Sequence, residues 1–181
     1  TDLEYCQAAN SAVGKNSKWG MFCIPGIAKL DDLEKAIDNN MGFVRVGTDV
    51  HKYKESEKFI RLAKKNGLKV FSNFMKSYVL QPREFAKLVQ KSTDFGADGV
   101  YLVDSAGGML PNQVRAFVAE SFNLNPKFNL GFHGHNNLAL GMANALVCIE
   151  EGVQFIDVSL QGLGRSGGNV PAEQFICTLD L

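Results

Sequence analysis

One unit recurs along the chain roughly every 25 to 30 residues: a short apolar run, a polar loop and then an amphipathic stretch. Six apolar runs lie at residues 21–24, 43–46, 68–74, 100–103, 130–133 and 155–158. Helical periodicity occupies residues 32–40, 53–66, 82–95, 111–122 and 138–151, and a last helical segment starts at residue 171. Most of the runs are apolar throughout, as in parallel strands covered on both faces. The alternation therefore predicts a parallel sheet built from βα units.

Prolines and glycines fall where the ends of these helices are expected. Three prolines occupy predicted first helical turns: Pro82, Pro111 and Pro171. Four glycines follow predicted helix ends: Gly42, Gly67, Gly96 and Gly152. Proline lacks the N–H that the first turn leaves unpaired, and glycine tolerates the left-handed conformation that ends many helices. The positions of the prolines and glycines thus agree with the helix ends that the apolar periodicity predicts.

Six βα units fit either an open, doubly wound sheet or part of an eight-fold barrel. No G-x-G-x-x-G follows the first run, and polar residues recur after several runs. These residues are Thr48, Asp49, Lys76, Ser77, Asp104, Ser105, His133, His135, Asp157 and Ser159. Chemistry spread over many strand ends is typical of the mouth of a barrel. We therefore predict an α/β fold of the TIM (β/α)8 type, in which residues 1–181 form a single partial domain with about six of the eight units.

Charge and cysteine content narrow the partners and the compartment. The 19 Lys and Arg residues balance 19 Asp and Glu residues, so no basic field is available for nucleic acid or anionic lipid, and neither is an expected partner. No apolar run reaches the length of a membrane span. The four cysteines form no C-x-x-C pair, which is typical of reduced thiols and predicts a cytoplasmic protein.

Residues 131–137 read G-F-H-G-H-N-N. Because side chains two residues apart in a strand share a face, His133 and His135 are predicted to point toward one spot. Two imidazoles can bind Mn²⁺, Zn²⁺ or Fe²⁺, and added carboxylates or waters favour harder octahedral ions. The alternative is a pair of hydrogen-bonded histidines without a metal. The third histidine, His51, lies in a charged loop and is predicted to be solvated.

Two glycine-rich segments follow predicted strands, D-S-A-G-G at 104–108 and G-L-G-R-S-G-G-N at 162–169. In the first, the Ser105 hydroxyl could hold a carboxylate or carbonyl oxygen, and a plain turn is the alternative. The second is predicted to lie on the substrate side, as a phosphate-binding loop or a mobile lid. Arg45 and Asp157 lie in apolar runs, where an unpaired charge is costly, so we expect each to have a partner inside the barrel and a structural role.

The stretch H-G-H-N-N-L at 133–138, with A-N at 143–144, G-L-G-R at 162–165 and G-N-V-P-A-E at 168–173, closely resembles the metal-dependent pyruvate aldolases that cleave 4-hydroxy-2-oxovalerate. These aldolases belong to the HMG-CoA-lyase-like superfamily of DRE-TIM metallolyases, which also includes isopropylmalate and homocitrate synthases. The resemblance covers essentially the whole chain and matches it to strands 3 to 8 of the family's barrel. The glycine loop contains no cysteine, which favours the aldolase branch over the lyases.

The resemblance implies a divalent metal, with Mn²⁺ first and Mg²⁺, Co²⁺ or Zn²⁺ as alternatives. It implies that His133 and His135 bind this metal, that His133 borders the substrate and that Ser105 contacts the bound 2-oxo acid. Asn169 matches the asparagine that completes the metal shell in the synthases and lyases. The metal would stabilise the pyruvate enolate that forms when a 4-hydroxy-2-oxo acid is cleaved. Implied partners are the 2-oxo acid substrate and either an acetaldehyde dehydrogenase or further copies of the chain.

The chain lacks the family's Arg-Asp pair and histidine base at the first strand and its C-terminal substrate-facing tyrosine. We therefore assign no catalytic residue within the chain and expect these 181 residues alone to be inactive. Lys76 stands where the aldolases usually carry an apolar residue, which also allows a Schiff-base aldolase, since burial can lower the pKa of such a lysine. An acyl-CoA-dependent synthase or lyase of the same superfamily and a non-catalytic, barrel-derived binding domain are also compatible with the sequence.

Overall fold

Six parallel strands lie side by side in sequence order in the computed structural model, which describes residues 2–179. The strands are β1 (Gly20–Cys23), β2 (Phe43–Asp49), β3 (Lys69–Met75), β4 (Gly99–Asp104), β5 (Leu130–Gly134) and β6 (Phe155–Ile156). Each predicted run overlaps one strand, so the α/β architecture with six barrel-type units is confirmed. One predicted boundary is wrong: β6 ends at Ile156, so Asp157 lies just beyond the strand.

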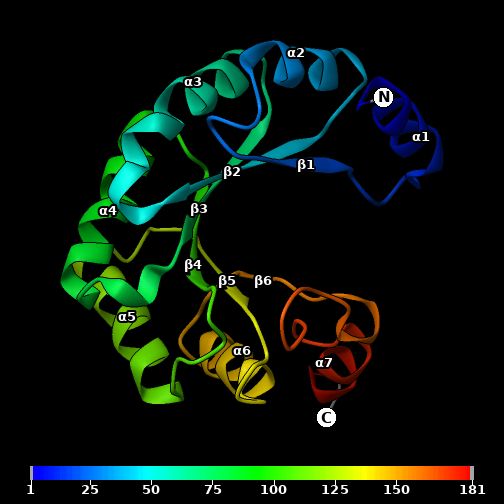
Figure 1. The fold of residues 1–181 in the computed structure, drawn as a ribbon. Coiled ribbons are helices and arrows are strands. Elements are labelled where there is room, and N and C mark those ends of the chain that lie inside the picture. Colours follow the sequence, from blue (N-terminus) through cyan, green and yellow to red (C-terminus); the bar gives the residue numbers. More distant parts are fainter. Residues whose placement is uncertain (1, 180–181) are drawn as a thin grey trace.

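Helices follow the strands and cover the outside of the curved sheet (Figure 1). The α-helices are α1 (Asp2–Ala12), α2 (Leu30–Asp38), α3 (Glu57–Lys65), α4 (Pro82–Phe95), α5 (Pro111–Leu124), α6 (Gly141–Glu150) and α7 (Ala172–Leu179). Three short 3₁₀ helices lie between them: η1 (Val50–Ser56), η2 (Ser77–Val79) and η3 (Leu160–Gly162). Together they form an open arc with α1 and β1 at one end and β6 and α7 at the other.

Two predicted helices start too early. Residues 53–56 belong to η1, which begins where the Asp49 carboxylate accepts a hydrogen bond from the His51 N–H. In the second case α6 begins only at Gly141, because Ala139 adopts a left-handed φ of 56° that no α-helix accommodates. Local side-chain and backbone contacts therefore decide these boundaries, and the apolar period does not reveal them.

The predicted positions of proline and glycine at the helix ends are largely confirmed. Pro82 and Pro111 begin α4 and α5, and Gly67, Gly96 and Gly152 have positive φ. Pro171 is an exception, because it stands just before α7 in a β-bridge with Ser159. Gly42 is a second exception.

Asn40 takes the left-handed conformation after α2, with φ of 61°. Gly42 instead allows a close approach, since a Cβ there would lie 2.8 Å from the Lys18 Cδ atom. The glycine is needed for space at this position and not for its φ.

The two faces of the sheet pack differently. On the helix side, strand valines such as Val44, Val46 and Val70 are fully buried in a cluster with residues of α2 and α3, and a second cluster joins the later strands to α4, α5 and α6. Successive strand residues point to opposite faces, so Phe43 and its equivalents lie on the inner face. There Phe71 makes edge-to-face contacts with three neighbouring rings: Phe43, Tyr101 and Phe155. The inner face of the arc is therefore lined with aromatic rings below the strand ends.

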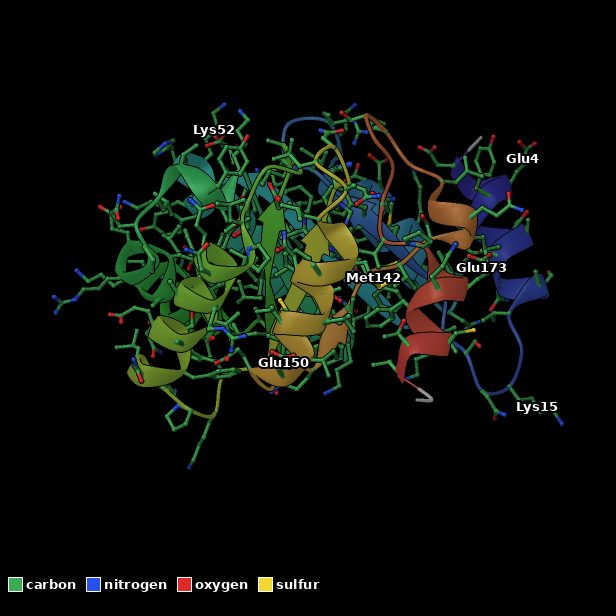
Figure 2. The ribbon with its side chains drawn as sticks, turned by 90° about the horizontal axis from the view of Figure 1, so that it is seen from below. Glu4, Lys15, Lys52, Met142, Glu150 and Glu173 are labelled. Atoms are coloured by element: carbon green, nitrogen blue, oxygen red, sulfur yellow. The ribbon has the colours of Figure 1, made fainter. Side chains whose placement is uncertain are left out.

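All strands run toward the same edge of the molecule. In Figure 2, Lys52, which follows β2, lies at the edge opposite Lys15 and Glu150, which precede β1 and β6. Within residues 2–179, β1 and β6 do not pair with each other, and no helix is long and apolar enough to cross a membrane. The carboxyl ends of the strands thus open on one side of an incomplete barrel.

Gly131 on β5 provides a test of the inner-face packing. A Cβ at this position would lie 2.6 Å from the Tyr101 ring, which contacts Phe71 at 6.0 Å between centroids and the Arg45 guanidinium at 3.9 Å. Because the ring is held on two sides, we expect Gly131→Ala to lower the free energy of unfolding by about 2 kcal/mol in urea denaturation. Gly108→Ala, where a Cβ meets no atom within 4 Å, is the matched control and should stay within about 0.5 kcal/mol. Equal unfolding midpoints for the two variants would contradict this packing.

Candidate functional site

A cavity of about 560 Å³ opens at the carboxyl ends of the strands. Its walls are formed by Phe22, Arg45, Asn73, Met75, Lys76, Val103, Ser105, His133, His135, Arg165 and Ser166. Strands β1 to β5, or the residues directly after them, each contribute to it, as does the loop after η3. The prediction that His133, His135 and Ser105 share one opening is therefore confirmed in the geometry.

The two histidine rings stand close together and perpendicular, with centroids 5.2 Å apart and planes at 89°. His133 lies in β5 and His135 directly follows the strand. The Nδ1 atom of His133 is 2.8 Å from the Asp157 carboxylate, and that of His135 is 3.2 Å from the Arg165 carbonyl oxygen. Neither a carboxylate nor a carbonyl can donate, so each Nδ1 carries the hydrogen. With the hydrogen on Nδ1, the Nε2 atom of each ring is the one that can bind a ligand through its lone pair.

Asp157 is the hub of the buried polar groups below the rings. Besides the His133 contact, its carboxylate accepts a hydrogen bond from the Arg45 guanidinium, which also donates to the Asn73 side chain. Burial by itself would raise the pKa of Asp157, but the His133 hydrogen bond and the Arg45 charge outweigh burial and hold that pKa below its ordinary value. Burial, with the nearby charge of Asp157, raises the pKa of the Tyr101 hydroxyl. Asp157 is thus kept as a carboxylate that only accepts hydrogen bonds.

Arg45 and Asp157 do pair inside the barrel, as expected, but their role is more than structural. Arg45 lines the cavity itself, and Asp157 orients a ring that faces it. The sequence indicates this pair only by placing two opposite charges in separate apolar runs. Only the register, in which Phe132 lies opposite Ile156, shows that the next pair is His133 and Asp157.

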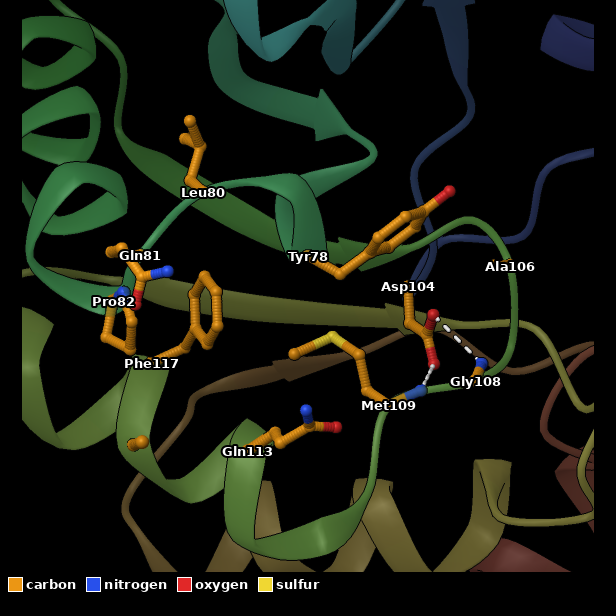
Figure 3. Close-up of a pocket in the computed structure, with 11 residues that line it drawn as sticks. Tyr78, Leu80, Gln81, Pro82, Asp104, Ala106, Gly108, Met109, Gln113 and Phe117 are labelled. Atoms are coloured by element: carbon orange, nitrogen blue, oxygen red, sulfur yellow. Dashed lines mark hydrogen bonds between the residues drawn. The ribbon is translucent and has the colours of Figure 1, made fainter.

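Ser105 is positioned by its neighbours in the loop after β4. Asp104, which is fully buried, accepts hydrogen bonds from the backbone N–H groups of Gly108 and Met109 and so closes the loop (Figure 3). Ser105 itself accepts a hydrogen bond of 3.0 Å from the Lys76 N–H. Gly107 has a φ of 60°, and a Cβ there would lie 2.7 Å from the His135 carbonyl oxygen. The loop therefore packs directly on the backbone of the histidine segment.

A second cavity, of about 510 Å³, lies on the other side of this loop (Figure 3). Its walls include Tyr78, Leu80, Pro82, Met109 and Phe117, and none of the site residues predicted from the sequence except Asp104. Both carboxylate oxygens of Asp104 are already bonded to backbone N–H groups. Asp104, one of the polar residues that follow the predicted runs, thus lines this second cavity and not the one with the histidines, because alternation along β4 turns it away from Ser105.

Asn169 lies beside the histidines without lining the cavity. Its backbone pairs with His135 in an antiparallel bridge, and its Nδ2 donates to the Leu163 carbonyl at 3.1 Å. A Cβ on Gly164 would lie 2.4 Å from that Nδ2, so only glycine leaves room for the side chain. The Oδ1 atom is buried and has no partner among residues 2–179. Asn169 thus carries an unpaired side-chain oxygen on a residue whose backbone pairs with that of His135.

These features fit a divalent metal. Metal-binding histidines usually donate their second N–H to a carboxylate or a carbonyl, which both rings do here. An unpaired amide oxygen is a further suitable ligand. Residues 2–179 contain no group of three or more His, Cys, Asp or Glu side chains placed to hold a metal. The described residues therefore offer a partial shell, to be completed by water, substrate oxygens or other protein groups.

Lys76 does not have the environment that Schiff-base chemistry needs. Its side chain is 57% exposed, and its Nζ lies 3.1 Å from the Asp49 carboxylate. The backbone hydrogen bond from His51 and the contact with Lys76 hold the pKa of Asp49 below its ordinary value, so the ion pair persists at neutral pH. The desolvation that would activate a lysine nucleophile is missing. His51 is exposed, as predicted.

Comparison with known proteins gives consistent matches. The HMGL-like family model matches residues 1–181. The 4-hydroxy-2-oxovalerate aldolase 2 of Rhodococcus opacus is 42% identical over 173 residues, which are 96% of this chain and 49% of that protein. The 4-hydroxy-2-oxovalerate aldolase of Geobacillus stearothermophilus is 37% identical over 179 residues, which are 99% of this chain and 52% of that protein. The chain thus spans about half the length of the curated relatives it matches.

Solved structures show the same fold. An HMG-CoA lyase from Brucella melitensis superposes with a TM-score of 0.82 at 18% identity, covering 96% of this chain and 70% of the lyase. An HMG-CoA lyase from Pseudomonas aeruginosa gives a TM-score of 0.82 at 18% identity, covering 96% of this chain and 66% of the lyase. The six βα units are therefore arranged as in part of a TIM-type barrel.

The lowered pKa of Asp157 predicts how stability depends on pH. A carboxyl whose pKa is lower in the folded state stabilises the protein above its unfolded pKa of about 3.9 and loses that contribution as the pH falls through the folded value. We expect Asp157→Asn to flatten the acid limb of the free energy of unfolding as the pH falls below about 5. At about pH 6 the variant should lose about 1 to 2 kcal/mol, because the partly buried Arg45 keeps its charge without its partner.

Urea denaturation at a series of pH values measures both effects. Asp38→Asn, which removes an exposed carboxyl, is the control and should change stability by less than about 0.5 kcal/mol near pH 6. An acid limb of unchanged slope in Asp157→Asn would show that Asp157 does not carry the proton linkage.

Proposed function

The chain belongs to the HMGL-like family, and on that premise we propose that it forms the metal-binding part of an aldolase that cleaves a 4-hydroxy-2-oxo acid through a pyruvate enolate. One observation carries the proposal: both histidines at the strand ends have their Nδ1–H groups held by an acceptor, which leaves two Nε2 atoms for one ion. Relatives named as 4-hydroxy-2-oxovalerate aldolases support this substrate class.

In this proposal His133 and His135 hold the ion, with Asn169 Oδ1 as a further ligand. Mn²⁺ is the first candidate and Mg²⁺, Co²⁺ or Zn²⁺ are alternatives. When bound, the ion supplies a Lewis acid that stabilises negative charge on the oxygens of a 2-oxo acid. Asp157 keeps the His133 ring in one tautomer and one orientation, and His133 borders the substrate.

Ser105 is proposed to bind the substrate directly. Its oxygen already accepts a hydrogen bond from the Lys76 N–H, so the hydroxyl hydrogen is free to donate to a carboxylate or carbonyl oxygen. Cleavage of the C3–C4 bond moves a proton from the 4-hydroxyl group to a base and returns a proton to C3. We assign neither the base nor the acid to any of residues 2–179, because the walls of the cavity at the strand ends contain no carboxylate.

Two competing functions from the same superfamily or fold are weaker. The identity to curated aldolases reaches 42%, whereas the solved HMG-CoA lyases share the fold at 18%, which favours an aldolase over an acyl-CoA-dependent lyase or synthase. A non-catalytic binding domain would not require a hydrogen-bond acceptor at the Nδ1–H of both histidines, which this structure has.

The setting of the enzyme is proposed from the same family likeness. The partners are the 2-oxo acid and either an acetaldehyde dehydrogenase, which would consume the aldehyde, or further copies of the chain. We place the protein in the cytoplasm, which is supported by four unpaired cysteines, Cys6, Cys23, Cys148 and Cys177.

We expect these 181 residues to bind the metal ion but not to cleave the substrate. Substoichiometric Mn²⁺ should broaden the NMR signals of the His133 and His135 rings more strongly than those of the exposed His51, because paramagnetic relaxation falls steeply with distance from the ion. The double variant His133→Gln, His135→Gln should abolish the preferential broadening. Uniform broadening of all three histidines would overturn the metal site.

The same sample should release no pyruvate from 4-hydroxy-2-oxovalerate in a coupled assay with Mn²⁺. Loss of one oxyanion-stabilising group alone typically costs about 10² to 10³ in rate, and the family's Arg-Asp pair does not occur in this sequence. The Rhodococcus opacus relative serves as the positive control. Turnover by residues 1–181 at the rate of the relative would show that the chemistry does not need that pair.

Lys76 provides the test of the Schiff-base mechanism. We expect no mass increase at Lys76 after incubation with pyruvate and borohydride, because the lysine is exposed and paired with Asp49. Peptide mass spectrometry measures the adduct, and Lys52, also exposed, shows the background of nonspecific reduction. An adduct at Lys76 well above that background would move the assignment to Schiff-base chemistry.

A further inference from the structure

The cavity at the strand ends is cationic although the chain as a whole is neutral. The 19 basic residues of the sequence balance 19 acidic ones, yet the described residues that line this cavity include Arg45, Lys76 and Arg165 and no Asp or Glu. A cleft lined by one sign of charge concentrates ligands of the other sign. The cavity therefore favours an anion, and the position of each cation decides which part of the ligand it meets.

The Arg45 guanidinium already has partners within the protein. Its guanidinium donates to Asp157 and to Asn73 and stacks on the Tyr101 ring at 3.9 Å. Its charge is thus neutralised within the cavity floor by a buried carboxylate. The two remaining cations are the ones available to a ligand.

Lys76 and Arg165 lie at the rim. Lys76 is 57% exposed, with Asp49 as its ion-pair partner. Arg165 is exposed, and its guanidinium has no ion pair or hydrogen bond within residues 2–179. An exposed lysine ion pair is worth little, so an anionic ligand can share the ammonium group without a large loss.

Both rim cations are attached to the candidate site through their own backbone. The Arg165 carbonyl accepts from the His135 ring at 3.2 Å, and the Lys76 N–H donates to Ser105 at 3.0 Å. The backbone of each cationic residue is therefore hydrogen-bonded to a residue proposed to bind the metal or the 2-oxo acid. A ligand seated between His135 and Ser105 would lie in the cavity that both cationic residues line.

The backbone at both cations is held in an uncommon conformation. Lys76 has a φ of 60°, and Ser166, which follows Arg165 and also lines the cavity, has a φ of 61°. Left-handed conformations cost energy for residues with a Cβ and persist where the surroundings enforce them, often at binding sites.

We propose that the substrate carries a second anionic group, a carboxylate or a phosphate, on the part released as the aldehyde, and that Arg165 and Lys76 bind it. The inference rests on the proposed aldolase function, in which the metal and Ser105 bind the 2-oxo acid end. Two further cations exceed what that single carboxylate requires. Cleavage of the C3–C4 bond then yields pyruvate and an acidic aldehyde in place of acetaldehyde, with one proton moved from the 4-hydroxyl group to C3 and no oxidant or reductant consumed. Of the two protein partners proposed above, this inference keeps further copies of the chain and not an acetaldehyde dehydrogenase.

Three non-cleavable ligands of matched length test this assignment by NMR titration of residues 1–181 with Mg²⁺, a diamagnetic ion. They are 2-oxovalerate, 2-oxoglutarate and 2-oxo-4-phosphonobutyrate, which share the 2-oxo acid end and differ in a terminal methyl, carboxylate or phosphonate group. We expect 2-oxoglutarate or the phosphonate to bind about fivefold more tightly than 2-oxovalerate, as two exposed ion pairs allow, and the preference to weaken in added salt. The tighter of the two identifies the anionic group.

Arg165→Gln and Lys76→Gln should each reduce this preference, because they weaken the binding of the two ligands with a second anionic group more than that of 2-oxovalerate, and Arg165→Lys should retain most of it. Lys52→Gln, which removes an exposed charge outside the cavity walls, is the matched control and should keep the full preference. An unchanged ¹H–¹⁵N spectrum away from the substituted loop shows that each variant is folded.

The outcomes separate the two levels of the proposal. Equal Kd values for the three ligands in the unaltered chain would overturn the second anionic group and leave the aldolase site standing. Equal weakening of all three ligands in Arg165→Gln and Lys76→Gln would also overturn it, because the cations would then serve the shared 2-oxo acid end. Failure of every ligand to bind would overturn the proposed function itself, and this inference with it.

Discussion

The candidate site depends on one partly buried carboxylate. Asp157 accepts from Arg45, which lies 112 residues earlier in the chain, and from His133, which lies 24 residues earlier. Losing either partner would leave a charge that is largely shielded from water, so the three side chains hold one another in a single arrangement. The orientation of the histidine ring at the cavity is therefore set by the packing of the barrel interior and not by the strand that carries it.

The loops above this floor are joined by a second set of contacts. Asn137 donates to the Ala106 carbonyl and accepts from the Gly167 N–H, so it connects both glycine-rich segments. Glycine is required at residue 107 because the loop touches the backbone of His135 there. These contacts place Ser105 and the Arg165 loop around the same opening. The floor of the site thus carries the groups proposed for the metal, and the rim carries the charges proposed to select the substrate.

Much of the fold is accessible from local pattern. The helix at 82–95 is predicted to the residue, because a first-turn proline and a terminal glycine bracket one apolar period. Predictions fail where a single contact overrides the period, as at Asn40, which takes the left-handed turn expected of Gly42, and at Ala139, which delays α6. Such contacts depend on neighbours in space that a linear pattern does not contain.

The sequence by itself determined the βα repeat, the pairing of His133 with His135 and the presence of Ser105 at a neighbouring strand end, because these follow from periods of two and of about four residues along the chain. Only the tertiary structure decided that Asp157 orients His133, that Asp104 faces away from the site and that Lys76 and Arg165 meet at one rim. The physical reason is register. Each of these relations joins residues on different strands or loops, and the offset between parallel strands is set by packing between the sheet and its helices, which no single segment encodes.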